Sequence, residues 1–511
     1  MNAVATATWT PSTPARSSGG GQSGTLTLIV LIATSLVMAA ITATGSRGLV
    51  IAAAPAVLLA GLAAMFVGPI RLGLFFIIFF GLGIDALGDG PWDSPLARFG
   101  ALMAYNLNVS MPLNVPMNGS LILMLLLVVI HAHRTLSGTG AQIDGRNRVP
   151  KELVLSLGVS AGAVFLLALW GANRGGDIQM AKIQVQHYLM MLLLAYLSAV
   201  GFRSVKDYRI VGRLIVIAAC IKALMAVYVI AITVPRPEYA TTHGDSVLFA
   251  AATVILLVRL AEQPSARTFG WCVLLLPIIG LGMQANDRRI VWVQIAVSLL
   301  MFWLVSRRTR AKRLVGAAML AASPLLLAYI AVGWNSQASI FSPIQALRST
   351  GAVGGNVDSS TLYRDTENYN LLLTLRYNQF LGAGFGQPFA EVVKLPDISF
   401  FKEYRYLPHN SILGLWAFTG AFGFTFLMAA LVVAVFFASR SYAVARTAEE
   451  RIAAFMVLAA VAIHLVHCWG DIGFSERHDV YIVGPAIGMA GHLAVATGAW
   501  RLTSPKRAVK A

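Results

Sequence analysis

Long apolar stretches alternate with short polar segments along almost the whole chain. A helix needs about 20 mainly apolar residues to cross the core of a bilayer, and about 14 stretches approach that length. They lie roughly at 25–43, 49–67, 71–87, 119–133, 153–170, 186–202, 210–233, 245–261, 269–286, 289–305, 314–333, 411–438, 451–469 and 479–499. Because a membrane barrel shows shorter segments of alternating polarity, these stretches predict helices. The expected fold class is an all-α polytopic membrane protein.

Composition supports this pattern and excludes an ordinary soluble domain. Of 511 residues, 57% are hydrophobic and only 12% are charged, with a mean hydropathy of +0.71. Residues 1–24 are rich in Ser, Thr, Gly and Pro, a composition that cannot build a core. No run of small residues typical of a cleavage site follows the first apolar stretch, so we expect a retained helix rather than a signal peptide.

The alternation of spans divides the chain into five regions and leaves two long loops on the outer side. One loop runs from about residue 88 to 118, the other from about 334 to 409. Within the second, apolar and charged residues interleave from Ser359 to Tyr377, which predicts an amphipathic helix that acts as a lid or an acceptor platform. The predicted regions are a disordered tail (1–24), N-terminal transmembrane helices (25–333), the outer loop with its amphipathic helix (334–409), C-terminal transmembrane helices (410–499) and a second tail (500–511).

The formal charge of +17 raises the question of a nucleic-acid partner. If both termini are cytoplasmic, most of the 39 Lys and Arg residues fall in segments on the cytoplasmic side. The densest cluster, within residues 307–313, lies in one short loop, where the positive-inside rule has most force. Topology therefore explains the charge, and no nucleic-acid partner is expected.

Metal-binding patterns are weak. Cys220, Cys272 and Cys468 lie in or beside apolar spans at unrelated spacings, without a disulfide or zinc signature. His464, His467 and Asp471 fall at i, i+3 and i+7, a spacing compatible with metal ligation. A polar stripe between helices, bonded to the backbone or to the intramembrane Lys222, is favoured over a metal, and neither a metal nor a cofactor is expected.

Ionisable residues gather at helix ends on the predicted outer side, which suggests a polar cleft there. The set is Arg174, Lys182, Arg236, His243, Asp245, Asp287, Arg288, Arg289, Arg405, His409, Arg477, His478 and Asp479. Cations outnumber acids, so the natural ligand is an anion, and guanidinium groups suit phosphate oxygens. A lipid-linked diphosphate fits this pattern.

Two segments of the cleft have specific chemistry. Residues 284–292 form a polar turn between two apolar spans, and its Arg288 and Arg289 lie beside a helix N-terminus, which also attracts anions. Their alternative role is to anchor the helix at the interface. His409 and Asn410 end the long outer loop. An imidazole there can serve as a general base for a sugar hydroxyl, or the pair can be a helix cap after Pro408.

A third outer segment runs from 235 to 246 and contains Arg236, His243 and Asp245. His243 and Asp245 can line an acceptor site together with Asn410 and Arg405, or His243 and Asp245 can cap the next helix. The turn at 477–479 can contribute to the cleft or be an ordinary solvated turn.

The order and spacing of several motifs resemble the O-antigen ligase and O-antigen polymerase superfamily. The motifs are Asn286-Asp287-Arg288-Arg289, Gly382-Ala383-Gly384-Phe385-Gly386, His409-Asn410 and Gly420-Ala421-Phe422-Gly423. The resemblance covers roughly residues 240–440 and departs from the family in its doubled arginine preceded by Asp287.

The resemblance implies a metal-independent, inverting glycosyltransferase of the bacterial inner membrane, with its active site on the periplasmic face and a lipid-linked-sugar donor. By that likeness Arg288 or Arg289 holds the undecaprenyl diphosphate of the glycan donor, Arg236 or Arg174 is the second phosphate ligand, and His409 activates the acceptor hydroxyl. The acceptor is a glycan on a second lipid carrier, in a polymerase, or the lipid A core, in a ligase. A chain-length regulator is a partner by the same analogy.

A polysaccharide flippase or other transporter is the competing class. It predicts repeated halves, broken helices near the bilayer midplane and charges deep within spans. Only Lys222 lies clearly inside a predicted span, and no repeat is visible. The sequence therefore favours the enzyme, leaning to a surface-polysaccharide polymerase because the long loop can hold a second lipid-linked chain.

Overall fold

We describe the protein from a computed structural model. It describes residues 25–26, 28–34, 36–37, 56, 59–83, 117–144, 149–232, 240–307, 310–336, 338, 341, 343–344, 348, 359–395 and 403–500. The predicted spans at 25–43 and 49–67 are described only in part, and nearly all of the first long loop and of both tails lies outside these residues.

The described elements are helices, as expected for the all-α class. They are α3 (Ile70–Gly83), α6 (Gly119–Leu136), α7 (Gly140–Ile143), α8 (Lys151–Asn173), α9 (Ile178–Gly201), α10 (Val205–Ile232), α11 (Asp245–Glu262), α12 (Ala266–Asn286), α13 (Ile290–Val305), α14 (Arg310–Gly333), α16 (Ser359–Tyr377), α17 (Ser411–Val444), α18 (Ala448–Gly470), the short 3-10 helix η2 (Gly473–Ser475) and α19 (Arg477–Ala496).

Among the described residues, eight helices are long and apolar enough to cross a membrane, and three shorter apolar helices accompany them. This makes the chain a multi-pass membrane protein. The predicted span at 245–261 corresponds to α11, which carries Asp245, Arg259 and Glu262 and is buried along most of its length. Its charges are tolerated because neighbouring helices surround it.

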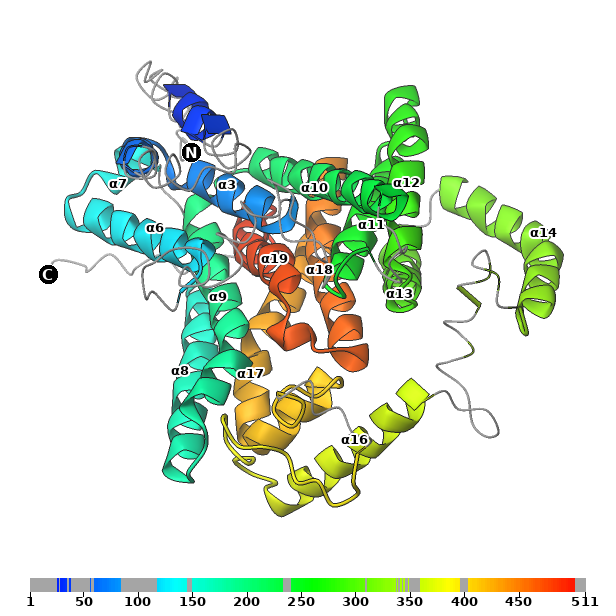
Figure 1. Ribbon diagram of the computed structural model, residues 1–511. Helices are drawn as coiled ribbons and strands as arrows, with labels where there is room; N and C mark the ends of the chain where they lie inside the picture. Colours follow the sequence, from blue (N-terminus) through cyan, green and yellow to red (C-terminus); the bar gives the residue numbers. More distant parts are fainter. Residues whose placement is uncertain are drawn as a thin grey trace, which may run out of the picture.

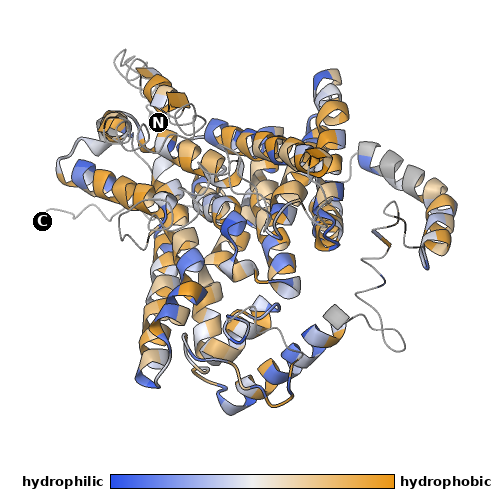
Figure 2. Cartoon of the chain, viewed as in Figure 1, coloured by the Kyte–Doolittle hydropathy of each residue, from blue (hydrophilic) through white to orange (hydrophobic). Residues whose placement is uncertain are grey.

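α19 lies at the centre of the bundle and packs against α9, α17 and α18 (Figure 1). Close packing with α9 depends on small residues, since a Cβ at Gly484 or Gly488 would lie 2.9 Å or 2.4 Å from a backbone oxygen of α9. Two glycines at i and i+4 allow the helix backbones to approach each other in a membrane. Apolar residues dominate the bundle, whereas α16 carries many hydrophilic positions (Figure 2).

Residues that the sequence assigns to the inner side meet in compact charge networks. Arg134 is buried and pairs with Asp144 at 2.7 Å, and Arg203 pairs with the same carboxylate at 3.4 Å. Arg71 pairs with Asp207. The helix ends involved come from α3, α6, α7 and α10, and all of them fall on one side in the predicted alternation of spans.

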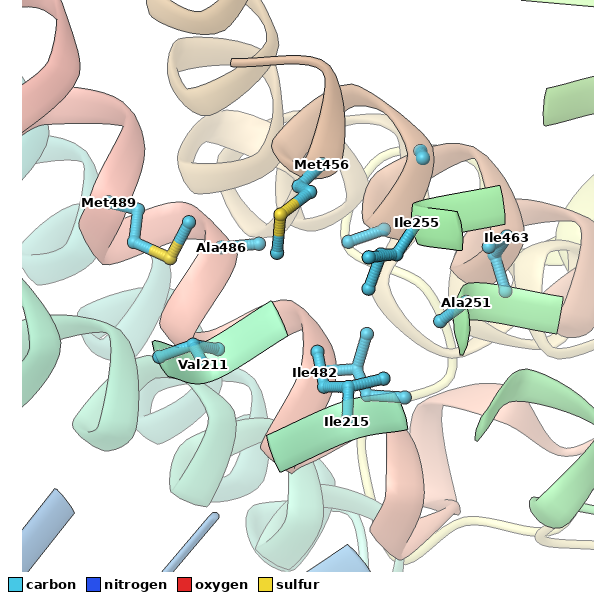
Figure 3. A pocket seen from close by; sticks show the side chains of 11 residues that line it. Val211, Ile215, Ala251, Ile255, Met456, Ile463, Ile482, Ala486 and Met489 are labelled. Atoms are coloured by element: carbon cyan, nitrogen blue, oxygen red, sulfur yellow. The ribbon is translucent and has the colours of Figure 1, made fainter. Parts of the chain in front are cut away.

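An apolar cavity lies between α10, α11, α18 and α19 (Figure 3). Its lining is Val211, Ile215, Ala251, Ile255, Met456, Ala459, Ala460, Ile463, Ile482, Ala486 and Met489. These side chains offer neither acids nor bases, so the chemistry must lie elsewhere.

Candidate functional site

The predicted amphipathic helix forms at the predicted residues, as α16, but its faces are used in an unexpected way. The side chains of Glu367, Asn370 and Thr374 are buried. Asn370 accepts hydrogen bonds from the backbone N–H groups of Val392 and Val393. The exposed positions are largely apolar: Leu362, Tyr369, Leu372 and Tyr377 are all more than half exposed. α16 thus directs polar residues toward the loop that it organises and apolar residues outward.

The glycine-rich segment 382–386 fits against a break in α17. Gly420 interrupts α17 with φ 62° and ψ −172°, so backbone groups near the break lose their helical partners. This segment and the residues just before it supply replacements: the N–H groups of Ala383 and Gly384 donate to carbonyls of α17 at 3.0 Å and 2.8 Å, and the N–H of Ala421 donates to the carbonyl of Gln379. Non-helical backbone in a membrane protein requires such pairing.

His409 is held by a buried carboxylate from α16. The backbone N–H of His409 donates to Glu367 Oε2 at 2.9 Å, and its Nδ1 lies 3.3 Å from Glu367 Oε1. The ring of Tyr363 packs edge-on against the imidazole. Burial, and then the charge of Glu367, raise the pKa of the Tyr363 phenol, so it stays neutral. The His409 side chain is 29% exposed and that of Glu367 is 1% exposed, which leaves Nε2 of the imidazole for a substrate.

Three other predicted site residues have contacts that order the loop. Asn410 caps α17 by accepting from the Leu413 N–H at 3.0 Å. Arg405 donates to the carbonyl of Phe389. Arg174 donates to Asn378 and to the carbonyl of Gly382, and its guanidinium lies over the Trp170 ring. These contacts fix the segment that carries His409, and a direct contact of these residues with substrate stays a prediction.

The polar turn between α12 and α13 forms where the sequence places it. Asp287 takes the left-handed conformation, with φ 48°, and thereby ends α12. Arg289 occupies the N-cap position of α13 and is exposed, whereas Arg288 is half-buried. Both are therefore beside the unpaired amides at the start of a helix. Arg236, the other predicted phosphate ligand, lies outside the described residues.

Asp471, at the end of α18, connects the three predicted segments. Its carboxylate is hydrogen-bonded to Nδ1 of His243, and its backbone carbonyl accepts from the Ser411 hydroxyl at 2.8 Å, two residues after His409. The preceding Gly470 lies against Ile290, the first residue of α13. His243, the start of α13 after the arginine turn and the start of α17 therefore all contact the end of α18.

Asp245 is fully buried, so no surface of it can meet a glycan. It accepts from the N–H and hydroxyl of Thr242 and pairs with Lys222 at 3.3 Å and with His478 at 3.2 Å. Its contacts are those of a buried ion pair that fixes the start of α11.

Two interpretations of the polar residues on α18 and α19 need correction. His464 and His467 both bind the Asp479 carboxylate, at 2.8 Å and 2.7 Å, and not Lys222. His478 and Asp479 are buried in the first turn of α19, so these two residues do not line an open cleft, whereas Arg477 is partly exposed. Within the part of the chain that the structure describes, no group of three His, Cys, Asp or Glu residues is arranged to hold a metal ion.

A small cavity lies between α9, the end of the long loop and the turn that follows α18, close to Asp471. Its lining mixes polar and apolar groups: Gln184, Phe385, Tyr406, Leu407, Pro408, Ser411, Gly414, Leu415, Phe418, Ile472, Phe474 and Ser475. Gln184 bridges two parts of the loop, accepting from the Gly386 N–H and donating to the Tyr406 carbonyl. The cavity therefore borders the segment that carries His409.

Two residues of the site were missed from the sequence. The sequence pattern assigns Glu367 only to the polar positions of an amphipathic helix. It assigns Asp471 only to a polar set with His464 and His467. Their partners lie 42 and 228 residues away, and no local spacing reveals such pairs. The one signal that could have indicated Glu367 is its position as the only acid among the residues on the buried face of α16.

Comparison with known families supports the resemblance. Residues 271–428 match the family described as O-antigen ligase. The matched stretch includes the arginine turn, α16, the glycine-rich segment and His409. No curated protein matches the chain. This stretch of the chain is therefore similar to that family, which supports an O-antigen ligase or polymerase type of function and a glycosyltransferase-like enzyme.

Proposed function

We propose that the protein joins a polyprenyl-diphosphate-linked glycan to an acceptor sugar hydroxyl, at a site formed by His409, Glu367 and the arginine turn. The observation that carries the proposal is the pairing of His409 with a buried carboxylate, inside the stretch that matches the O-antigen ligase family. The active site then faces the periplasm, with both termini in the cytoplasm and the chain in the bacterial inner membrane.

In this mechanism Glu367 accepts the Nδ1 proton of His409 in a hydrogen bond and so presents Nε2 as the base. Nε2 takes the proton of the acceptor hydroxyl. The hydroxyl oxygen attacks the anomeric carbon as the bond from that carbon to the diphosphate oxygen breaks, and the lipid diphosphate leaves with the electron pair. A single displacement inverts the anomeric configuration, and neither a metal nor a cofactor takes part.

Glu367→Gln is expected to lower kcat about 10²-fold, because an amide can stabilise the wrong imidazole tautomer and does not stabilise the imidazolium. The measurement is glycan transfer by purified protein with saturating donor and acceptor. Asp365→Asn, which changes an exposed acid on the same helix, is the matched control and should retain wild-type kcat. A Glu367→Gln enzyme with normal kcat would remove Glu367 from the mechanism.

The arginine turn is proposed to bind the diphosphate, since guanidinium groups and the start of α13 both favour phosphate oxygens. Either Arg288→Ala or Arg289→Ala is expected to raise the KM for the donor about 10- to 100-fold, the effect of one charge-assisted hydrogen bond. Measuring donor KM for each variant identifies the ligand. Unchanged donor KM in both variants contradicts the assignment and leaves these residues as interfacial anchors. Arg236 and Arg174 remain proposed second ligands.

The acceptor is proposed to be a glycan on a second lipid carrier, which makes the protein a surface-polysaccharide polymerase. The exposed apolar residues of α16 give a lipid-linked acceptor a surface on the helix whose opposite, buried face holds His409 through Glu367. Asn410, Arg405 and His243 are proposed contacts of the acceptor site. Transfer of glycan to lipid A core by the purified protein would instead assign it as a ligase. A chain-length regulator is a partner that the polymerase assignment implies.

A further inference from the structure

His243 and His409 are held in the same way by different parts of the chain. Each imidazole is bonded through Nδ1 to a carboxylate that is buried, Asp471 for His243 and Glu367 for His409. The His243 side chain is 38% exposed and the His409 side chain 29%. With Nδ1 committed to Asp471, Nε2 is the nitrogen that His243 can offer to a ligand.

His243 lies on the arginine side of Asp471. Its own segment is joined to the end of α12, because the Ala240 N–H donates to the Ala285 carbonyl at 3.1 Å. Asn286 donates to the Ser246 hydroxyl at 2.8 Å. The other side of Asp471 contacts Ser411 and leads to His409. His243 is therefore placed for the donor diphosphate and not for the acceptor hydroxyl.

Asp471 presents a negative charge to the ring of His243. Burial alone would raise the pKa of Asp471, but the hydrogen bond and charge of His243, together with His467, outweigh it and leave that pKa below its ordinary value. Asp471 therefore remains an anion beside the imidazole. Other charged groups lie near this pair and partly neutralise one another. They are Lys222, Asp245, Glu476, Arg477 and His478.

We propose that His243, as an imidazolium held by Asp471, donates a hydrogen bond from Nε2 to a phosphate oxygen of the lipid diphosphate, beside the arginine turn. This assignment rests on the proposed function and changes the role of His243 from acceptor contact to donor contact. Because Nδ1–H faces Asp471, Nε2 carries a hydrogen only in the protonated ring. Diphosphate affinity is then strong at low pH and declines as pH rises and the imidazole loses its proton.

The test measures binding of geranylgeranyl diphosphate to the full chain in phosphatidylcholine nanodiscs, at about pH 5.5 and about pH 8.5, on either side of imidazole titration. The variants are His243→Gln, whose amide can still donate to Asp471, and the exposed, distant His133→Gln. The ligand itself titrates over this range, so the informative quantity is the difference between each variant and the wild type.

We expect His243→Gln to weaken binding about 10- to 100-fold at the lower pH and to leave it unchanged at the higher pH. His133→Gln should bind as the wild type does at both pH values. If inorganic diphosphate displaces the bound geranylgeranyl diphosphate and nanodiscs containing phosphatidylglycerol do not, the site recognises a diphosphate rather than the headgroup of an anionic lipid. Equal competition by phosphatidylglycerol overturns the donor assignment.

Two outcomes separate this inference from the proposed function. If the wild type binds the lipid diphosphate and His243→Gln binds it equally well at both pH values, the role of His243 is wrong and the transferase proposal stands. If the wild type binds no lipid diphosphate at either pH, the donor assignment fails and the proposed function fails with it.

Discussion

Replacing His409 with alanine is expected to reduce kcat for glycan transfer by about 10² to 10⁴-fold, the range typical of a lost general base. Donor KM should change little, because His409 is proposed to act on the acceptor hydroxyl and not on the diphosphate. The measurement is steady-state transfer by purified protein, with His133→Ala as a histidine control at an exposed position far from the site. A large rise in donor KM with unchanged kcat would show that His409 binds substrate without acting as the base.

The second large effect concerns the packing of the glycine-rich segment. A Cβ at Gly171 would lie 1.9 Å from the Phe385 carbonyl oxygen, whereas a Cβ at Gly162, on the same helix, meets nothing within 4 Å. Gly171→Ala therefore forces apart α8 and the segment that supports His409. It should destabilise the protein by about 3 kcal/mol or more, in the range of severe core overpacking.

Gly162→Ala provides the control for the second effect, because it makes the same chemical change in the same helix. Alanine there is expected to be neutral or to stabilise by about 0.5–1 kcal/mol. Thermal unfolding of the two variants in detergent, followed by circular dichroism, compares them directly. Equal melting temperatures would contradict the close approach between α8 and residues 382–386.

The apolar pattern predicted most described helices well, because lipid leaves the backbone few alternatives. The stretch at 269–286 corresponds to α12, and that at 451–469 to α18. α16 begins and ends at the predicted residues. The break at Gly420 within α17 was not predicted, since its apolar pattern continues without interruption and its cause is the distant segment that pairs with it.

The candidate site was predictable in its motifs and not in its partners. His409, the arginine turn and His243 were each found from polar residues at the ends of apolar spans. Which acid serves which histidine depends on tertiary packing: Glu367 holds His409, Asp471 holds His243, and Asp245 is buried against Lys222. Charge counting could not distinguish the acid that pairs with a buried lysine from the two acids that pair with partly exposed histidines.

The competing transporter class expects charged residues deep in the bundle, and the buried Lys222 and Asp245 are such residues. Lys222 pairs with Asp245, and Asp245 also pairs with His478, so these opposite charges balance inside the protein, as in a structural ion pair. The family match over residues 271–428 favours the enzyme. A transport mechanism that used the Lys222–Asp245 pair would require these residues to exchange partners. In the proposed enzyme the pair has only a structural role.

The most direct test of the central claim is the surface-polysaccharide profile, on gels, of a strain lacking the gene. The strain is complemented with wild type, His409→Ala, Arg288→Ala or Arg289→Ala, after each variant has been detected in the membrane. We predict that His409→Ala and one arginine variant fail to restore long glycan. If those variants still make products that carry a single repeat unit, the protein is a polymerase. If they make no lipid-A-linked glycan at all, it is a ligase. Normal glycan from all three variants would contradict the proposed site and favour transport or assembly.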